Sequence, residues 1–166
     1  CQNIFPAVAL VVSGGHTQLY LLNSFQDIAL LGQTQDDAVG EAFDKVARLL
    51  GFEYPGGPHI ETLAKKGKEG ALHFPSPMAK SEDYQFSYSG LKTSVLYFLQ
   101  KQKKPLNEEL AADVALAFQD AAFGVIVEKT KRALKEYGVR SLLLGGGVSA
   151  NEALKKKLQE MTKEIT

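Results

Sequence analysis

The sequence predicts an α/β fold, chiefly because strand patterns and helix patterns alternate along it. Residues 7–13 form a continuous apolar run rich in valine, which is typical of a strand buried on both faces. Two further strand patterns follow at 17–22 and 28–34, so the chain opens with a β-meander. Helical periodicity then dominates until a short apolar run at 141–144 predicts one more strand.

The helices are expected from periodicity and from the residues that begin and end them. Asp36 or Asp37 can cap a helix that continues through Leu50 and ends at Gly51. The other helical patterns cover 60–66, 91–102 and 107–137, the last as one long helix or two abutting ones. Residues 54–58 and 67–83 are expected to be irregular.

Composition limits the class of protein. The 166 residues suffice for one domain with a real core. Lys and Arg equal Asp and Glu at 19 each, so no overall charge attracts nucleic acid. The single cysteine, Cys1, excludes an internal disulfide and fits a reducing compartment, so we expect the cytoplasm. No apolar run approaches the roughly 20 residues that span a bilayer, so no membrane is expected.

Glycine-rich turns are the most informative motifs, and there are three of them, at 13–17, 54–58 and 145–151. Glycine lets backbone N–H groups approach a ligand, and successive N–H groups form concavities that bind anions. Three such turns in a short chain predict a site for a phosphorylated ligand such as a nucleotide. The alternative at each position is a tight turn without a ligand, and for the last turn the two interpretations are about even.

The last glycine turn joins a strand to a helix N-terminus, where unpaired N–H groups favour phosphate. It is not a P-loop, because the Lys-Ser/Thr pair that should follow is missing. Capping-box spacing from Ser149 to Glu152 makes Ser149 the expected N-cap of the final helix. Asn151 is then a local cap or a ribose ligand, and capping by Ser149 favours the second role.

Polar side chains near the other turns are weaker candidates. Ser13 and Thr17 can donate to phosphate oxygens, and His16 can donate or bind metal, although a lone histidine is more often structural. Asp44 or Glu41 can face a ligand across a helical glycine, Gly40; a solvated acidic face is the alternative. The block 86–93 can act only as a helix cap and as a segment that packs on the core. Clusters of basic residues are most simply solvated faces, although they can contact RNA phosphates: Lys101-Lys103-Lys104, Lys129-Lys131-Arg132-Lys135 and Lys155-Lys156-Lys157.

Taken together, five blocks resemble the TsaD/Kae1/Qri7 (Gcp) family of tRNA N6-adenosine threonylcarbamoyltransferases, once known as O-sialoglycoprotein endopeptidases. The blocks occur in family order over nearly the whole chain and are closest to the bacterial branch: 11–19, 36–45, 54–58, 86–93 and 146–151. The resemblance implies the ASKHA fold of actin, Hsp70 and sugar kinases (RNase H-like), with residues 1–166 as a partial domain covering mainly one lobe.

The resemblance also implies an activity and a site. The family transfers a threonylcarbamoyl group from threonylcarbamoyl-AMP to N6 of adenosine 37 in tRNAs that read ANN codons. The implied substrate-binding residues are Val11, Val12, Ser13, Gly14, Gly15, Asp44, Gly57, Glu61 (where aspartate is more usual) and Asn151. No general base is assigned within the chain, and the catalytic residues are unknown.

Metal and partners are implied in the same way. Family members hold iron or zinc with an H-x-x-x-H pair ahead of the block at Ser13 and an aspartate near the C-terminus. Neither lies in this chain, so we expect a fragment that is inactive alone. Implied partners are tRNA, a TsaB-like paralogue and a TsaE-like ATPase. The alternatives are a non-catalytic nucleotide-binding scaffold of the same complex and an ASKHA phosphotransferase; a peptidase has the least support.

Overall fold

A four-stranded sheet forms one end of the molecule in the computed structural model, which describes residues 4–139 and 141–165. The sheet order is β3-β2-β1-β4. The strands β1 (Ala7–Val12), β2 (Thr17–Leu22) and β3 (Ile28–Gln33) form the expected antiparallel meander, and β4 (Ser141–Gly145) returns parallel to β1. This mixed α/β architecture confirms the predicted fold class. Cys1 lies outside the described residues.

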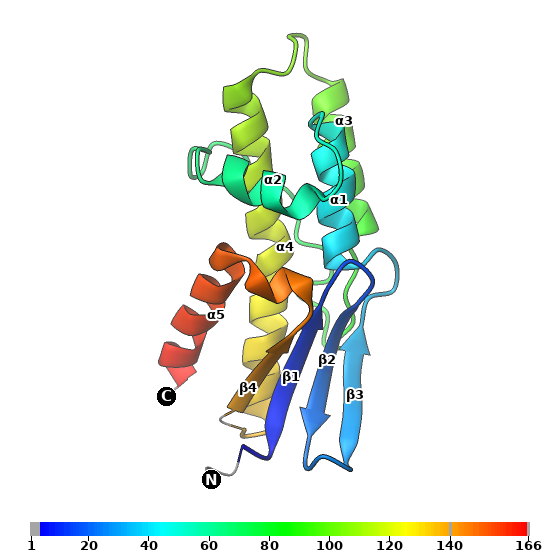
Figure 1. Cartoon of the computed structure of the whole chain (residues 1–166), viewed down its shortest axis with the longest axis vertical. Coiled ribbons are helices and arrows are strands. Elements are labelled where there is room, and N and C mark those ends of the chain that lie inside the picture. The colour runs from blue at the N-terminus through cyan, green and yellow to red at the C-terminus, as the bar shows by residue number, and fades with distance from the viewer. Residues whose placement is uncertain (1–3, 140, 166) are drawn as a thin grey trace.

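Four helices lie between β3 and β4 in the sequence, and the first three extend beyond the ends of the strands (Figure 1). They are α1 (Val39–Leu49), α2 (Gly56–Ala64) and α3 (Ser89–Gln100). The fourth, α4 (Glu108–Glu136), is one continuous helix that packs on these helices at one end and behind the sheet at the other. After β4, a 3-10 turn η1 (Gly147–Ala150) leads to α5 (Glu152–Ile165), which packs beside α4.

The core lies between the sheet and α4. Val8, Leu10 and Val12 of β1 are fully buried and belong to one cluster with the apolar side of α4. Burying a side chain of this size stabilises the fold by about 1.5–3 kcal/mol. Between α1 and α4, Phe43 stacks on Phe123 with ring centroids 5.1 Å apart and meets Phe118 edge-on at 4.9 Å.

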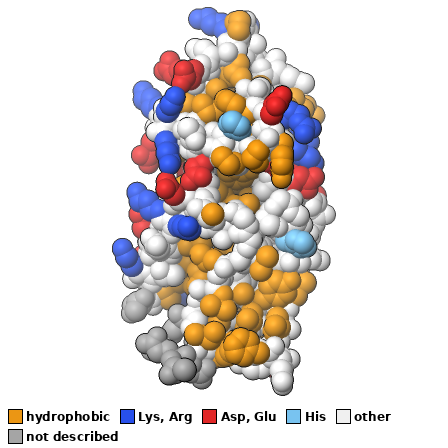
Figure 2. Space-filling model, in the orientation of Figure 1, with side chains coloured by type: hydrophobic (Ala, Val, Ile, Leu, Met, Phe, Trp, Pro, Cys, Tyr) orange, Lys and Arg blue, Asp and Glu red, His pale blue; other side chains and the backbone are white. Residues whose placement is uncertain are grey.

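The opposite sheet face is apolar and open. Alternation along the strands places Val11, Tyr20 and Ile28 on this face, around a shallow depression of about 410 Å³. Figure 2 shows hydrophobic side chains gathered over these strands. The sheet therefore has one face packed against α4 and one face without cover from the described residues.

Three expected boundaries were wrong. The first helix begins at Val39 after Ala38, whose side chain makes no cap hydrogen bond, because Asp36 and Asp37 are engaged elsewhere. The expected loop 54–58 already contains the first residues of α2, which starts at Gly56. The final helix is capped by Asn151 instead of Ser149.

The expectation about membrane spans also needs a correction. By length and composition alone, α4 is apolar enough to cross a membrane, although 67% of its most apolar window is buried inside the protein. Core helices of globular proteins meet the same two criteria, so α4 alone is weak evidence for a membrane.

Candidate functional site

A cavity of about 280 Å³ lies where all three glycine-rich turns meet. Its walls come from the β1–β2 turn, from α1, from the start of α2 and from η1. The lining residues are Gly14, Gly40, Phe43, Asp44, Tyr54, Pro55, Gly57, Pro58, Glu61, Gly147, Val148, Ala150 and Asn151. The predicted site residues Gly14, Asp44, Gly57, Glu61 and Asn151 are therefore brought together from four separate parts of the chain.

The rest of the predicted loop does not line this cavity. Val12 is fully buried in the core, and Val11 lies on the open sheet face. The Ser13 hydroxyl accepts hydrogen bonds from the N–H groups of Gly15 (3.3 Å) and His16 (3.0 Å), and so closes the turn. Exposed backbone at Gly14 and Gly15 is what this turn offers to a ligand.

Gly40 is required where α1 approaches this turn. Its N–H donates to the Ser13 carbonyl at 3.1 Å, and a Cβ on Gly40 would lie only 2.6 Å from that oxygen. Real Cβ contacts do not come so close, so the helical glycine is explained by backbone packing. Close packing here fixes α1, and with it Asp44, relative to the glycine turn.

Asp44 joins α1 to the start of α2. One carboxylate oxygen accepts the Gly56 N–H at 2.8 Å, so Asp44 satisfies a donor that the helix leaves free at its N-terminus. The second oxygen is not needed for this contact, and Asp44 lines the cavity. Glu41 instead pairs with Lys45 at 3.1 Å and does not line the cavity, which leaves Asp44 as the acidic candidate of α1.

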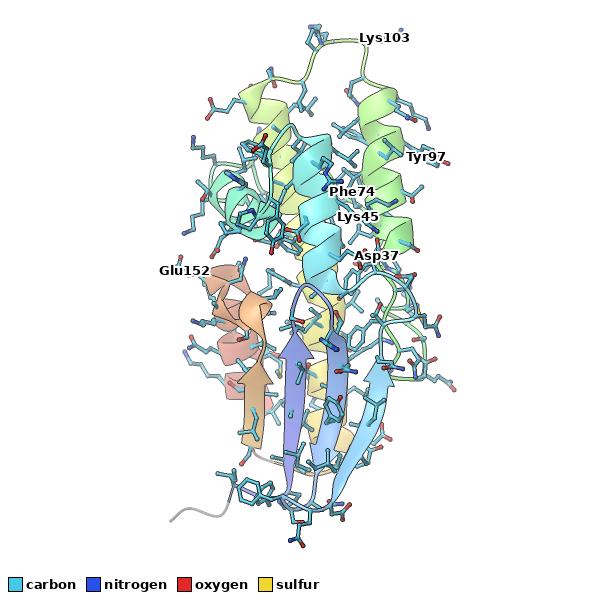
Figure 3. All side chains as sticks on the ribbon, turned by 45° about the vertical axis from the view of Figure 1, so that its right-hand side comes forward. Asp37, Lys45, Phe74, Tyr97, Lys103 and Glu152 are labelled. Carbon is cyan, nitrogen blue, oxygen red and sulfur yellow. The ribbon has the colours of Figure 1, made fainter. Side chains whose placement is uncertain are left out.

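Glu61 joins α2 to α5 across the cavity. Its Oε1 accepts the Glu152 N–H at 2.8 Å, and the Glu152 carboxylate pairs with Lys65 at 2.8 Å. Figure 3 shows Glu152 at the end of α5 that faces α2. Gly57 lies one turn before Glu61, and a Cβ there would meet nothing within 4 Å, so open space adjoins its backbone.

Asn151 is the N-cap of α5, contrary to the expectation that Ser149 plays this part. Asn151 Oδ1 accepts the N–H groups of Ala153 (2.9 Å) and Leu154 (3.1 Å). The Ser149 hydroxyl instead donates to the Gly146 carbonyl at 2.6 Å and closes the 3-10 turn. The argument that Ser149 frees Asn151 for a ligand is therefore wrong, although Asn151 does line the cavity.

The block 86–93 lies outside the cavity and is held by Asp36, a role that sequence reasoning missed. The Asp36 carboxylate accepts hydrogen bonds from the hydroxyls of Ser87 (2.5 Å) and Ser89 (2.8 Å) and from the N–H groups of Tyr88 (2.7 Å) and Ser89 (3.1 Å). Partial burial raises the pKa of Asp36, but these hydrogen bonds outweigh it and hold the pKa below its usual value. Asp36 thus caps α3. Asp37 pairs with Lys45 at 2.7 Å (Figure 3).

One basic cluster was misjudged. Lys129, expected on a solvated face, is 0% exposed. Its ammonium donates to Ser81 Oγ (2.8 Å) and to the carbonyls of Asp83 (3.1 Å) and Gln85 (2.5 Å). Burial lowers the pKa of Lys129, with the Asp83 carboxylate acting in the opposite direction. Lys129 therefore holds the segment 81–85 onto α4.

The chemistry of the cavity is divided between its walls. Backbone N–H groups of Gly14 and of the start of η1 favour negative charge, whereas the first N–H groups of α5 are taken by Glu61 and Asn151. The carboxylates of Asp44 and Glu61 accept hydrogen bonds and suit hydroxyl groups. Within residues 4–139 and 141–165, no three His, Cys, Asp or Glu side chains are grouped to hold a metal ion. This combination suits a ligand that carries both a phosphate and a ribose.

Comparisons with known proteins identify similar chains. The family model described as "TsaD: tRNA N6-adenosine threonylcarbamoyltransferase" matches residues 2–166. A protein of that name from Thermosipho africanus is 48% identical over 159 residues, which are 96% of this chain and 48% of the relative. One from Thermotoga neapolitana is 49% identical over 95% of this chain and 47% of the relative. The chain thus spans about half the length of the curated relatives that it matches.

A likeness to a solved structure supports the fold alone. The crystal structure of T. kodakarensis HypF matches 83% of this chain and 17% of its own, with a TM-score of 0.57 and 22% identity.

Proposed function

Because the chain belongs to the tRNA N6-adenosine threonylcarbamoyltransferase family, we propose that its cavity binds the adenylate part of threonylcarbamoyl-AMP. By binding this substrate, the protein takes part in transfer of the threonylcarbamoyl group to N6 of adenosine 37 in tRNAs that read ANN codons. The observation that supports this most is the convergence of Gly14, Asp44, Glu61 and Asn151 on one cavity.

In this proposal different walls of the cavity bind different parts of the ligand. The backbone N–H groups of Gly14 and of the start of η1 face the phosphate, and the free oxygens of Asp44 and Glu61 accept ribose hydroxyls. Negative charge that develops on the departing AMP is stabilised by the same N–H groups, which are already oriented before the reaction. Tyr54 lines the cavity and is exposed, and we expect the carbamoyl end to lie toward this open rim, where tRNA can reach it.

The reaction itself is attack of the adenine N6 amine on the carbamoyl carbonyl carbon. A new C–N bond forms, the C–O bond to the phosphate breaks, AMP leaves, and N6 loses a proton. The described residues do not fit the iron or zinc that the family resemblance implies, because no three of their His, Cys, Asp or Glu side chains are grouped to hold a metal ion. No step is therefore assigned to a metal, and no general base is assigned in this chain.

The proposal extends to partners and location. We expect tRNA, a TsaB-like paralogue and a TsaE-like ATPase to act with the full-length protein in the cytoplasm, and the present residues to be inactive alone.

Calorimetric titration of the full-length protein with AMP tests the cavity. We expect saturable binding that Asp44→Asn weakens about tenfold, since Asn keeps the acceptor for Gly56 and changes the group that faces the ligand. Glu41→Gln on the same helix is the matched control and should bind AMP within about twofold of wild type. A folded protein that does not bind AMP would contradict the proposal.

A cellular measurement tests the transfer. When the full-length protein is the sole copy in the cell, tRNA hydrolysates analysed by mass spectrometry should contain threonylcarbamoyladenosine. We expect Asp44→Asn to lower its amount and Glu41→Gln to leave it unchanged. Equal amounts in both variants would argue against a role of the cavity in transfer.

A further inference from the structure

Gln119 is a buried polar side chain beside the cavity that the proposed function does not yet use. It lies in the middle of α4, is 4% exposed, and is one of five buried polar or charged residues in the part of the chain that is described. Burying an amide is costly unless its hydrogen bonds are made. Its Oε1 lies 3.4 Å from Nδ2 of Asn151, which is 9% exposed.

The capping contacts fix which end of the Asn151 amide points where. Oδ1 accepts two backbone N–H groups of α5, and a carbonyl oxygen has two lone pairs, so its acceptor capacity is used. An exchange of Oδ1 and Nδ2 would place an NH₂ group against two N–H donors. Nδ2 must therefore point away from α5, toward α4.

Gln119 is then oriented in turn. Since Asn151 presents Nδ2, Gln119 must present its oxygen, as the contact shows. Nδ2 carries two hydrogens. One is taken by Gln119, the structure records no partner for the other among the described residues, and Asn151 is one of the residues that line the cavity. The only hydrogen-bonding group that the Asn151 side chain has left for a ligand is thus an N–H donor.

We propose that Gln119 is a positioning residue that holds the Asn151 amide as a hydrogen-bond donor toward an acceptor oxygen of the bound ligand. The inference rests on the proposed function, because it takes the ligand to be an adenylate. It restricts the ligand atom at this place to an acceptor, such as a ribose or phosphate oxygen, and excludes an atom that can only donate.

The test compares two substitutions of Gln119 in the full-length protein. Gln119→Met keeps the length and removes the acceptor, and we expect AMP to bind about tenfold more weakly. Gln119→Glu keeps an acceptor oxygen in either protonation state and should restore AMP affinity to within about threefold of wild type. Equal affinities for the two variants would overturn the proposal, because a role in packing alone does not distinguish them.

The substitution Asn151→Asp tests the capping role of Asn151 separately from its role as a hydrogen-bond donor. Asp retains the oxygen that caps α5, so the unfolding midpoint should stay at or above that of wild type. The donor is lost, so binding of adenosine, a neutral ligand that avoids charge repulsion, should fall about tenfold. In the Asn151→Asp background, Gln119→Met should weaken adenosine no further. Additive losses would show that Gln119 does not act through Asn151.

A measurement without ligand distinguishes this inference from the proposed function. In ¹⁵N–¹H spectra of the free protein, Gln119→Met should shift the Asn151 side-chain amide signals and speed their exchange with solvent, and Gln119→Glu should not speed it. Unchanged signals would overturn the coupling between the two residues. If wild type fails to bind AMP while these signals respond as expected, the adenylate proposal and the donor role fail, and only the Gln119–Asn151 contact stands.

Discussion

Gly146 lies so close to Val12 that a Cβ on Gly146 would overlap the Val12 carbonyl oxygen, and its φ of 88° is one that side chains rarely adopt. Two backbones thus touch where β1 ends and where the chain leaves β4 for η1. The contact places one glycine turn of the cavity directly against the strand that leads into another.

Replacement of Gly146 should therefore destabilise both the fold and the site. We expect Gly146→Ala to lower the free energy of unfolding by about 2–4 kcal/mol, from steric overlap and from the positive φ together. Urea unfolding followed by circular dichroism measures this. Gly147→Ala is the neighbouring control, because a Cβ there meets nothing within 4 Å; equal losses in both variants would refute the steric argument.

Because of Asp36, the free energy of unfolding should depend on pH in the acid range. Its pKa is lowered in the folded state, so its contribution is complete above its unfolded pKa of about 3.9 and is lost as pH falls through the folded value. Asp36→Asn should cost about 1 kcal/mol at pH 7, the usual size for a helix cap, with solvent screening the charge.

Thermal unfolding between pH 2 and pH 7 checks this expectation. The difference between wild type and Asp36→Asn should shrink as the pH falls below 3.9. Glu53→Gln, on the exposed surface, serves as control and should stay within about 0.5 kcal/mol of wild type throughout. A constant difference between wild type and Asp36→Asn at every pH would contradict the assignment.

Lys129 should matter far more than its neighbour Lys131. Lys129→Met leaves the Gln85 carbonyl without its donor and takes one of two donors from the Asp83 carbonyl, so we expect a loss of about 1–3 kcal/mol and faster proteolysis within 81–85. Lys131→Met removes only a partly exposed pair with Glu164 and should cost at most about 1 kcal/mol. Similar protease sensitivity in the two variants would show that Lys129 does not hold this segment.

Gly124 offers a stabilising change. It lies in the middle of α4 and is exposed to solvent. A Cβ there meets nothing within 4 Å, so Gly124→Ala should raise the free energy of unfolding by about 0.5–1 kcal/mol. Gly138, at the end of α4, has equal space but a φ of 64°. Gly138→Ala should therefore destabilise, and denaturant titration of both variants checks the opposite signs.

Local patterns predicted most of the fold. Apolar runs and glycine stops identified the four strands of the described chain and the extent of α4, which was expected as one long helix or two abutting ones, because these signals depend on residues close together in sequence. The start of α2 escaped prediction because Pro-Gly-Gly-Pro is typical of a loop, and the donor at Gly56 is satisfied by Asp44, which lies twelve residues earlier. Contacts between distant segments are not visible in a local pattern.

The candidate site was predicted in part for the same reason. The family resemblance implied Asp44, Glu61 and Asn151, and the structure brings them to one cavity. Gln119 carries no signal in an alanine-rich helix, because only the return of the chain at Asn151 makes it a partner. Two capping residues within three positions, Ser149 and Asn151, could not be ranked without the geometry of the 3-10 turn.

The continuity of α4 constrains how its length can vary. Gln119 meets Asn151 at the cavity, and Lys129 holds the segment 81–85 ten residues further along the same helix. Deleting one residue between them would rotate everything beyond by about 100° and draw it back by about 1.5 Å. Either contact could then be kept only by breaking the other. Substitutions in this interval are tolerable in principle, whereas the number of residues in it is fixed.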